Sequence, residues 1–193
     1  MANRALLDAL DASLPGDAVD RLEHRGQTSL WIARQLLGRD PDTGWCERLE
    51  RRYAELLDDT SHWRAPPEAA GTLAELQGRG VRLSLLTGNA EGVARLRMDR
   101  LGLARYFPPG QGAFGCESED RVELIRRALS RAGVQPREAV EIGDTPLDVE
   151  TAHRAGIRSI GFHSPRSTGV ELTAAEAVVD SFPDLVPLLT DAA

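Results

Sequence analysis

The chain has 193 residues, enough for one hydrophobic core with a small second lobe. Its net charge of -7 argues against a nucleic-acid partner, and all 23 basic residues are arginine, so no mechanism can use a lysine. We expect neither a signal peptide nor a membrane span, because no apolar run is long enough to cross a bilayer, and we therefore expect a cytoplasmic protein without a membrane partner.

The first third of the chain shows only helical periodicity. A helix is expected over Leu6–Leu14, where leucines recur at helical spacing, and Pro15-Gly16 ends it. Two further helices are expected over 28–37 and 45–57. Because Ala65-Pro66-Pro67 is typical of a hinge, we predict that the helices before it form a separate, all-helical lobe.

Beyond this hinge, helices and strands alternate. Helices are expected over 68–77, 90–101, 121–132, 146–155, 169–174 and 183–189, and strands over 81–86, 139–143, 157–162 and 177–179. Such alternation implies right-handed crossovers and a mostly parallel sheet. We therefore predict an α/β fold, with a small helical lobe over residues 1–64 and a Rossmann-like core over residues 65–193.

Residues 139–156 are the most informative stretch of the chain. They predict a strand, a tight turn and a helix that Thr145 caps. Asp144 and Asp148 then lie at the carboxyl end of the strand, where ligands bind in open parallel sheets. A capping box between Thr145 and Asp148 is an alternative explanation for Asp148, but it gives Asp144 no structural role.

A second strand end carries small polar groups at Thr87-Gly88-Asn89. A hydroxyl, an unhindered backbone N–H and the start of a helix together suit an anion such as phosphate. The alternative is that Asn89 caps the following helix and that Thr87 is incidental. Because a carboxylate beside a phosphate site is a usual arrangement for Mg2+, we expect Asp144 to ligate that ion.

Four motifs follow one another in a specific order, although each alone would be weak. They are Leu-Leu-Thr-Gly-Asn (85–89), Gly-Leu-Ala-Arg-Tyr-Phe (102–107), Gly-Ala-Phe-Gly (112–115) and Gly-Asp-Thr-Pro-Leu-Asp-Val (143–149). Together they resemble the haloacid dehalogenase superfamily, and most closely its phosphoglycolate-phosphatase-like branch. The resemblance covers residues 65–190, and the helical lobe is similar to the cap of that family.

The resemblance implies a Mg2+-dependent phosphatase that acts on a small phosphorylated metabolite through an aspartyl-phosphate. It implies that Thr87 holds a phosphate oxygen, in a pocket that Gly88 and Asn89 shape. It also implies that Asp144 is a Mg2+ ligand and that Asp148 supports the metal shell.

The family also uses a basic residue, usually lysine, after the Gly-Ala-Phe-Gly loop. Here the candidate is Arg121, whose guanidinium can supply a fixed positive charge and a two-pronged phosphate contact. The alternative is that Arg121 is a solvated residue at the start of a helix.

The first strand of that family has no counterpart in this chain. In the family this strand ends in Asp-x-Asp-Gly-Thr and carries both the nucleophile and the general acid and base. Asp40 and Asp42 form a similar string, but a helix precedes them instead of a buried strand. Asp8 and Asp11 have the wrong spacing and lie on the polar face of a helix. We therefore assign no catalytic residue.

The missing strand would lie between the strands that end at Thr87 and Asp144, so its absence leaves two inner sheet edges. Each orphaned buried backbone group costs about 1–3 kcal/mol. Three alternatives follow: the true start lies upstream of Met1, the two strands pair directly, or a partner chain or second copy donates a strand. We expect no turnover from the chain as written. The protein is then either a phosphatase whose nucleophile is missing from the written sequence, or a non-catalytic protein that binds phosphate and Mg2+.

Two cysteines remain. Cys46 and Cys116 are too few and too far apart to indicate a disulfide framework or a metal site. Cys116 follows the Gly-Ala-Phe-Gly loop, but no base is available to activate it, so we expect no reactive role.

Overall fold

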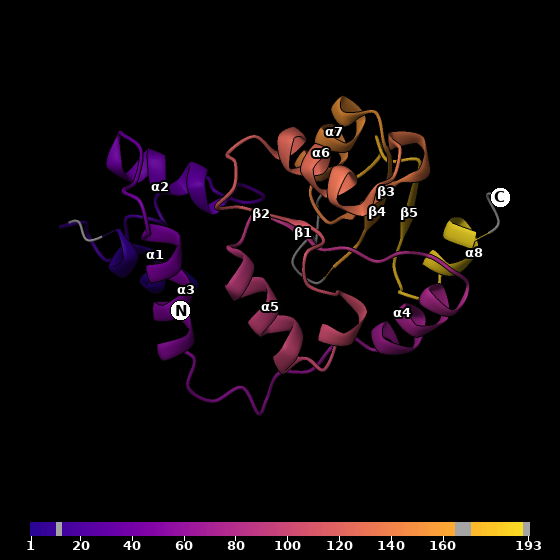
Figure 1. Cartoon of the computed structure of the whole chain (residues 1–193), viewed down its shortest axis with the longest axis horizontal. Coiled ribbons are helices and arrows are strands. Elements are labelled where there is room, and N and C mark those ends of the chain that lie inside the picture. The colour runs from indigo at the N-terminus through magenta and orange to yellow at the C-terminus, as the bar shows by residue number, and fades with distance from the viewer. Residues whose placement is uncertain (11–12, 165–170, 191–193) are drawn as a thin grey trace.

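The computed structural model describes residues 1–10, 13–164 and 171–190, and it confirms the α/β class (Figure 1). Its helices are α1 (Ala2–Ala9), α2 (Ser29–Leu37), α3 (Trp45–Glu55), α4 (Ala69–Gly78), α5 (Glu91–Arg100), α6 (Arg121–Ala132), α7 (Pro146–Ala155) and α8 (Leu185–Thr190). Its strands are β1 (Leu86–Thr87), β2 (Ala113–Phe114), β3 (Val140–Gly143), β4 (Arg158–Phe162) and β5 (Ala177–Val179). Short 3-10 helices lie at Ala104–Tyr106 and Pro136–Glu138.

Some expected elements were wrong. The strand expected over 81–86 is reduced to β1 at Leu86–Thr87. The helix expected over 169–174 is not present at 171–174, and its first residues lie outside the described part of the chain, as does Asp11. The segment 104–115, expected as a loop, contains the short strand β2.

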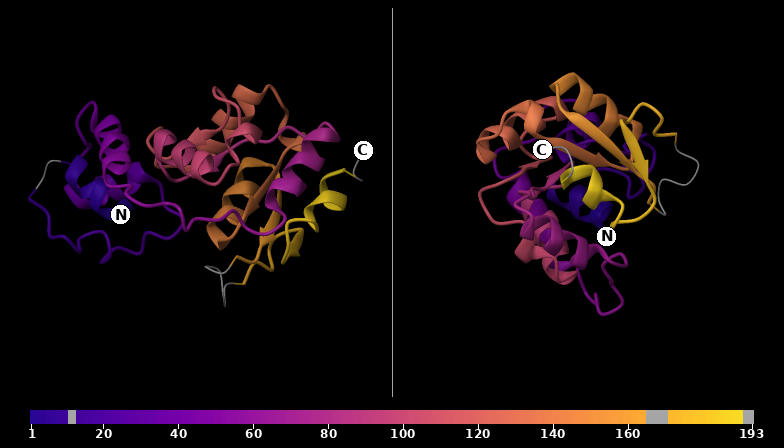
Figure 2. Two further views of the ribbon diagram at one scale, coloured as in Figure 1. Left: turned by 90° about the horizontal axis from the view of Figure 1, so that it is seen from below. Right: turned by 90° about the vertical axis from the view of Figure 1, so that its right-hand side faces the viewer.

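The N-terminal helices α1, α2 and α3 pack around one apolar cluster. Leu6 of α1 and Tyr53 of α3 are almost fully buried in it, and Ala90 and Val93 at the start of α5 join the same cluster. Figure 2 shows these helices grouped at one end of the molecule. Because α5 follows β1 directly, this cluster brings the N-terminal helices against the end of that strand.

The strands form two separate parallel sheets. In the first, β1 pairs with β2, with Leu86 opposite Ala113. In the second, the order is β3-β4-β5, with Ile142 opposite Ile160. Helices α6 and α7 pack on one face of the second sheet and α8 packs on the other, so the sheet is covered on both sides (Figure 1).

β1 and β3 are not hydrogen-bonded to each other, and a cavity of about 1320 Å³ lies between them. Leu83 and Leu85 line it from one side, and Val140 and Ile142 from the other. The backbone groups of residues 82–84 have no hydrogen-bond partner within the described ranges. The alternative that the two strands pair directly is therefore wrong. The expected strand over 81–86 is short for the same reason, because a strand needs a neighbour on which to form its ladder.

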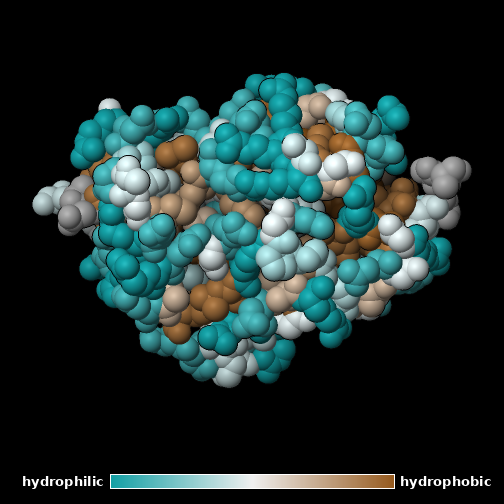
Figure 3. Space-filling model, viewed as in Figure 1, coloured by the Kyte–Doolittle hydropathy of each residue, from teal (hydrophilic) through white to brown (hydrophobic). Residues whose placement is uncertain are grey.

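The surface in Figure 3 is mostly polar, and apolar side chains show chiefly in recesses, one of which lies just above α4 in this view. Ile142 is one of the large apolar residues left exposed, at 42% of its surface. In the described part of the chain, no helix is both long and apolar enough to cross a membrane.

Candidate functional site

All the site residues predicted from the sequence line the cavity between β1 and β3. They are Thr87, Gly88, Asn89, Arg121, Asp144 and Asp148. They come from segments far apart in the chain: the turn after β1, the first turn of α6, and the turn and helix after β3. Arg121 and Asp148 are in direct contact, whereas the Thr87–Asn89 turn and Asp144 share the lining of the cavity. The structure thus places all the predicted residues on one cavity.

The turn after β1 is organised by the Thr87 hydroxyl. Its Oγ1 accepts hydrogen bonds from the backbone N–H of Asn89, at 3.2 Å, and from Nδ2 of Asn89, at 2.9 Å. Asn89 therefore does not cap α5, whose N-cap is Ala90 without a side-chain hydrogen bond. With two donors on its oxygen, the Thr87 hydroxyl can still donate its own hydrogen to an anion in the cavity.

The N-terminal helices contact this turn at Gly88. Its carbonyl oxygen accepts from the backbone N–H of Ser29, at 2.7 Å, and from Ser29 Oγ, at 3.0 Å. A Cβ at Gly88 would lie 2.3 Å from the carbonyl oxygen of Gln27, so a larger residue does not fit without a backbone shift. The Gly88 N–H has no partner among the residues described, which leaves it available to a ligand.

Asp144 follows β3 and is half-buried. Its Oδ2 accepts a hydrogen bond from Ser164 Oγ, at 2.7 Å, and its Oδ1 has no partner within the described residues. The described part of the chain contains no cluster of three or more histidine, cysteine or carboxylate side chains that could hold a metal ion. Asp144 therefore offers a single carboxylate, which suits Mg2+ only if water and a ligand phosphate supply the other oxygens.

Both carboxylate oxygens of Asp148 accept hydrogen bonds from other residues of the chain. Oδ2 accepts from Thr145 N, at 3.0 Å, and from Thr145 Oγ1, at 2.7 Å, while the Asp148 N–H donates back to Thr145 Oγ1. This is the capping box that the sequence offered as an alternative. Oδ1 accepts from the guanidinium of Arg121. With both oxygens engaged, Asp148 is placed to support the site and not to ligate an ion directly.

Arg121 is buried, with 8% of its side chain exposed, so the alternative that it is a solvated helix-start residue is wrong. Its Nη1 donates to the carbonyl oxygen of Gly26, at 3.1 Å. Its Nη2 donates to Asp148 and, at 3.4 Å, to Oε1 of Glu141. Its Nε has no partner among the described residues. The guanidinium thus joins the loop before α2 to β3 and α7.

Glu141 was missed by the sequence analysis. It lies in β3 with 6% of its side chain exposed, and its Oε2 has no partner in the described chain. Burial raises the pKa of its carboxyl from 4.5 to about 7; Arg121 opposes this increase and the carboxylate of Asp148 adds to it. A charged residue between Val140 and Ile142, inside an otherwise apolar strand, was the available signal.

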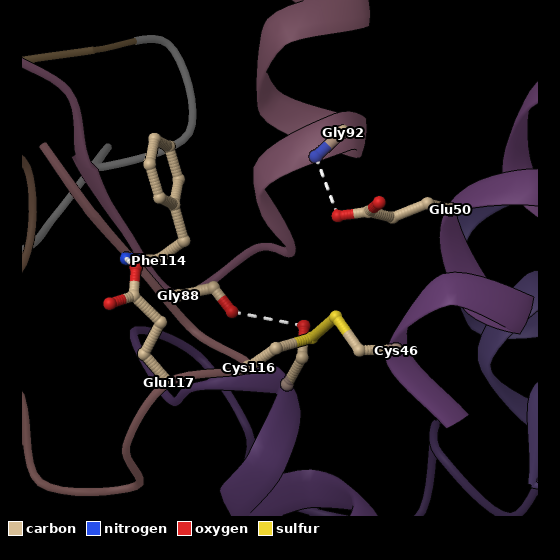
Figure 4. The surroundings of a disulfide bond; sticks show 8 residues. Cys46, Glu50, Gly88, Gly92, Phe114, Cys116 and Glu117 are labelled. Carbon is tan, nitrogen blue, oxygen red and sulfur yellow. Dashed lines mark hydrogen bonds between the residues drawn. A yellow bond between two sulfur atoms is a disulfide. The ribbon is translucent and has the colours of Figure 1, made fainter. Parts of the chain in front are cut away.

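The two cysteines form a disulfide, which the sequence analysis did not expect. Cys46 lies at the start of α3 and Cys116 directly follows Gly115, with their Cα atoms 6.2 Å apart. Figure 4 shows the disulfide close to Gly88. The earlier interpretation failed because the cysteines are 70 positions apart in the sequence, and only the packing of α3 on the loop after β2 brings them together.

Comparison with known families gives one match over most of the chain. The family model described as haloacid dehalogenase-like hydrolase matches residues 17–162. That range includes the N-terminal helices α2 and α3 as well as β1 to β4.

The curated relatives of this chain include several phosphatases. A phosphoglycolate phosphatase from Rhodospirillum rubrum is 34% identical over 170 residues, which is 79% of this chain and 70% of that protein. One from Salmonella choleraesuis is 27% identical over 143 residues, which is 72% of this chain and 56% of that protein. A phosphoserine phosphatase from Thermus thermophilus is 39% identical over 97 residues, or 49% of this chain. The chain thus spans little more than half the length of several of the relatives that it matches.

Solved structures share the fold. CbbY from Rhodobacter sphaeroides, crystallised in complex with phosphate, aligns with a TM-score of 0.69 at 19% identity, covering 95% of this chain and 88% of that one. A hydrolase from Deinococcus radiodurans with bound phosphate and sodium aligns with a TM-score of 0.60 at 19% identity, covering 99% of this chain and 87% of that one.

Proposed function

The chain belongs to the haloacid dehalogenase-like hydrolase family, and from this premise we propose that its cavity is the phosphate-binding half of a Mg2+-dependent phosphomonoesterase site. The observation that carries the proposal is that Thr87, Gly88 and Asp144 line one cavity at the carboxyl ends of two parallel strands. The names of the curated relatives favour a small phosphorylated metabolite, such as phosphoglycolate, as the substrate class.

In this proposal the phosphate lies against the turn after β1. The Thr87 hydroxyl and the Gly88 N–H donate to its oxygens, and the first turn of α5 adds the positive end of a helix dipole. Arg121 lines the cavity and contributes positive charge to it. Its Nε has no protein partner among the described residues, so this N–H can donate to the phosphate.

Asp144 is the residue that would hold Mg2+. Its Oδ1, which has no partner within the described residues, fits this role, because Mg2+ in phosphate sites is bound by one or two carboxylates together with water and phosphate oxygens. When bound, Mg2+ would neutralise the negative charge of the phosphoryl oxygens. Asp148 would keep α7, and with it Asp144, in position through Thr145 and Arg121.

The described residues do not provide an obvious nucleophile. The carboxylates that line the cavity are those of Glu138, Glu141, Asp144 and Asp148. Glu138 caps Gln135, Asp148 and Glu141 bind Arg121, and Asp144 is the proposed metal ligand. We therefore propose that hydrolysis needs an aspartate delivered by an additional β-strand lodged between β1 and β3, and that the 193-residue chain alone has no turnover.

The same carboxylate assignments favour one second candidate, a protein that binds a phosphorylated ligand and Mg2+ without hydrolysis. The two candidates differ in what completing the sheet does. For the phosphatase, an added strand that carries an aspartate creates activity. For the binding protein, the added strand changes stability only.

The experiment fuses a short β-strand ending in Asp-x-Asp ahead of Met1, which is feasible because Ala2 and Asn3 line the same cavity. We expect Mg2+-dependent hydrolysis of p-nitrophenyl phosphate by the fused protein. A matched fusion with Asn in place of the first Asp should be inactive, and so should the active fusion carrying Asp144→Asn. An active 193-residue chain, or a folded but inactive Asp-x-Asp fusion, would overturn the proposal.

A further inference from the structure

The disulfide joins two parts of the fold that are 70 positions apart in the sequence. Cys46 belongs to the N-terminal helices, and Cys116 belongs to the loop that follows β2. Both residues are half-buried, so a reductant in solvent has access to the bond. Between α3 and α4, the connecting segment 56–68 runs as a loop along the bottom of Figure 1 and is mostly exposed.

At this junction the N-terminal helices share an apolar cluster with Ala90 and Val93 at the start of α5, and specific hydrogen bonds cross it. The Ser29 N–H donates to Gly88 O, at 2.7 Å, and the Leu30 N–H donates to Gly115 O, at 2.8 Å. On the other side of the disulfide, the Gly92 N–H donates to Oε1 of Glu50, at 2.7 Å (Figure 4). Each of these amides reports on whether the N-terminal helices are docked on the strand ends.

The same junction forms part of the cavity wall. Ser29 and Gln27 from the N-terminal helices and their preceding loop line the cavity together with Gly88. If the N-terminal helices pivot away from β1 and β2, this part of the wall moves with them. With the disulfide intact, the helices are held by two covalent connections, the segment 56–68 and the Cys46–Cys116 bond. With the disulfide reduced, one covalent connection remains, and only non-covalent contacts oppose a pivot about it.

We propose that Cys46–Cys116 is a redox latch that holds the N-terminal helices closed over the cavity. A dithiol opens it by exchange: a thiolate of the reductant attacks one sulfur and forms a mixed disulfide, and the second thiol of the reductant then displaces that cysteine. Cys46 and Cys116 end as two thiols, having gained two electrons and two protons, and the dithiol ends as a disulfide. The proposal concerns access to the cavity, and it does not depend on the reaction proposed above.

The test is amide hydrogen exchange, measured by NMR on the full chain in oxidised form, after reduction with dithiothreitol, and in the Cys46→Ser/Cys116→Ser variant. We expect reduction to speed exchange at Ser29, Leu30 and Gly92 by at least about tenfold. Amides inside α2 and in β4 should keep their rates, because a latch releases the helices as a unit. The double variant should match the reduced protein with or without dithiothreitol.

Two results would overturn the latch. Unchanged exchange at Ser29, Leu30 and Gly92 would mean that the non-covalent contacts hold the junction by themselves. An equal loss of protection in β4 would mean that the disulfide stabilises the whole fold and does not control one junction. Small-angle scattering on the same samples gives an independent readout, since an opened junction increases the radius of gyration whereas a closed one leaves it unchanged.

Discussion

The buried carboxyl of Glu141 should make the stability of this protein fall as pH rises. Burial raises the pKa of this group from 4.5 to about 7, so the folded chain retains a proton that the unfolded chain has already lost. Because the folded state binds more protons between these values, its stability decreases with pH across this interval. The contribution is fully present below the unfolded pKa and is lost as pH rises through the folded one.

The size of the effect follows from the same interval. From 4.5 to about 7, at about 1.4 kcal/mol per pH unit, the free energy of unfolding should lose about 3 kcal/mol. This is a large share of the roughly 5–15 kcal/mol typical of a whole domain. The side chain of Glu141 is 6% exposed, so solvent screening reduces the figure little.

The assay compares urea unfolding of the wild type and Glu141→Gln between pH 4.5 and 8. Glutamine keeps the shape and an acceptor for Arg121 but cannot ionise. We expect the stability of the wild type relative to this variant to decrease by about 3 kcal/mol over that range. Glu150→Gln is the matched control, since it removes a carboxylate from an exposed position on α7, and it should follow the wild type. A difference between wild type and Glu141→Gln that does not change with pH, or that increases, would refute the reasoning.

Two further predictions concern the surroundings of the cavity. Gly88→Ala should destabilise the fold by about 1–3 kcal/mol in thermal or urea unfolding, because its Cβ would lie 2.3 Å from Gln27 O. Gly71→Ala in α4, where a Cβ meets nothing within 4 Å, should be neutral or slightly stabilising, and equal losses for both variants would contradict this explanation. Amides of residues 82–84 should exchange rapidly while those of β4 stay protected, because the former have no hydrogen-bond partner in the described chain. Full protection of 82–84 in the isolated monomer would show that the gap between β1 and β3 is closed in solution.

Most of the helices were predictable because their signals are local. Thr28 caps α2 by accepting from the Trp31 N–H, at 3.1 Å, and Gly133 and Gly156 end α6 and α7 in the left-handed conformation. Thr145 and Asp148 likewise form their capping box within a single turn. Each of these interactions joins residues that are close in sequence, so the sequence pattern alone is enough to predict where these helices begin or end.

The features that the sequence did not predict depend on contacts between residues that are distant in the sequence. The apolar stretch 81–86 has the composition of a strand, but only Leu86 and Thr87 find a paired neighbour. The burial of Arg121 depends on Glu141 and Asp148, which lie 20 and 27 positions away. A first-turn arginine has the same local pattern whether it faces solvent or a buried carboxylate, so its environment could not be inferred from the sequence.

The disulfide also makes a closed covalent ring of the chain between Cys46 and Cys116, which contains α4, β1, α5 and β2. A protease that cuts the exposed segment 56–68 would therefore break the chain without separating the fragments. The nicked protein would run as one species in electrophoresis without reductant and as two after reduction. Thr87, Arg121 and Asp144 all follow such a cut in the sequence, so the backbone keeps them together in one fragment. The disulfide retains the other fragment, which carries Gln27 and Ser29 of the cavity wall, so oxidation lets the complete cavity survive a break in the backbone.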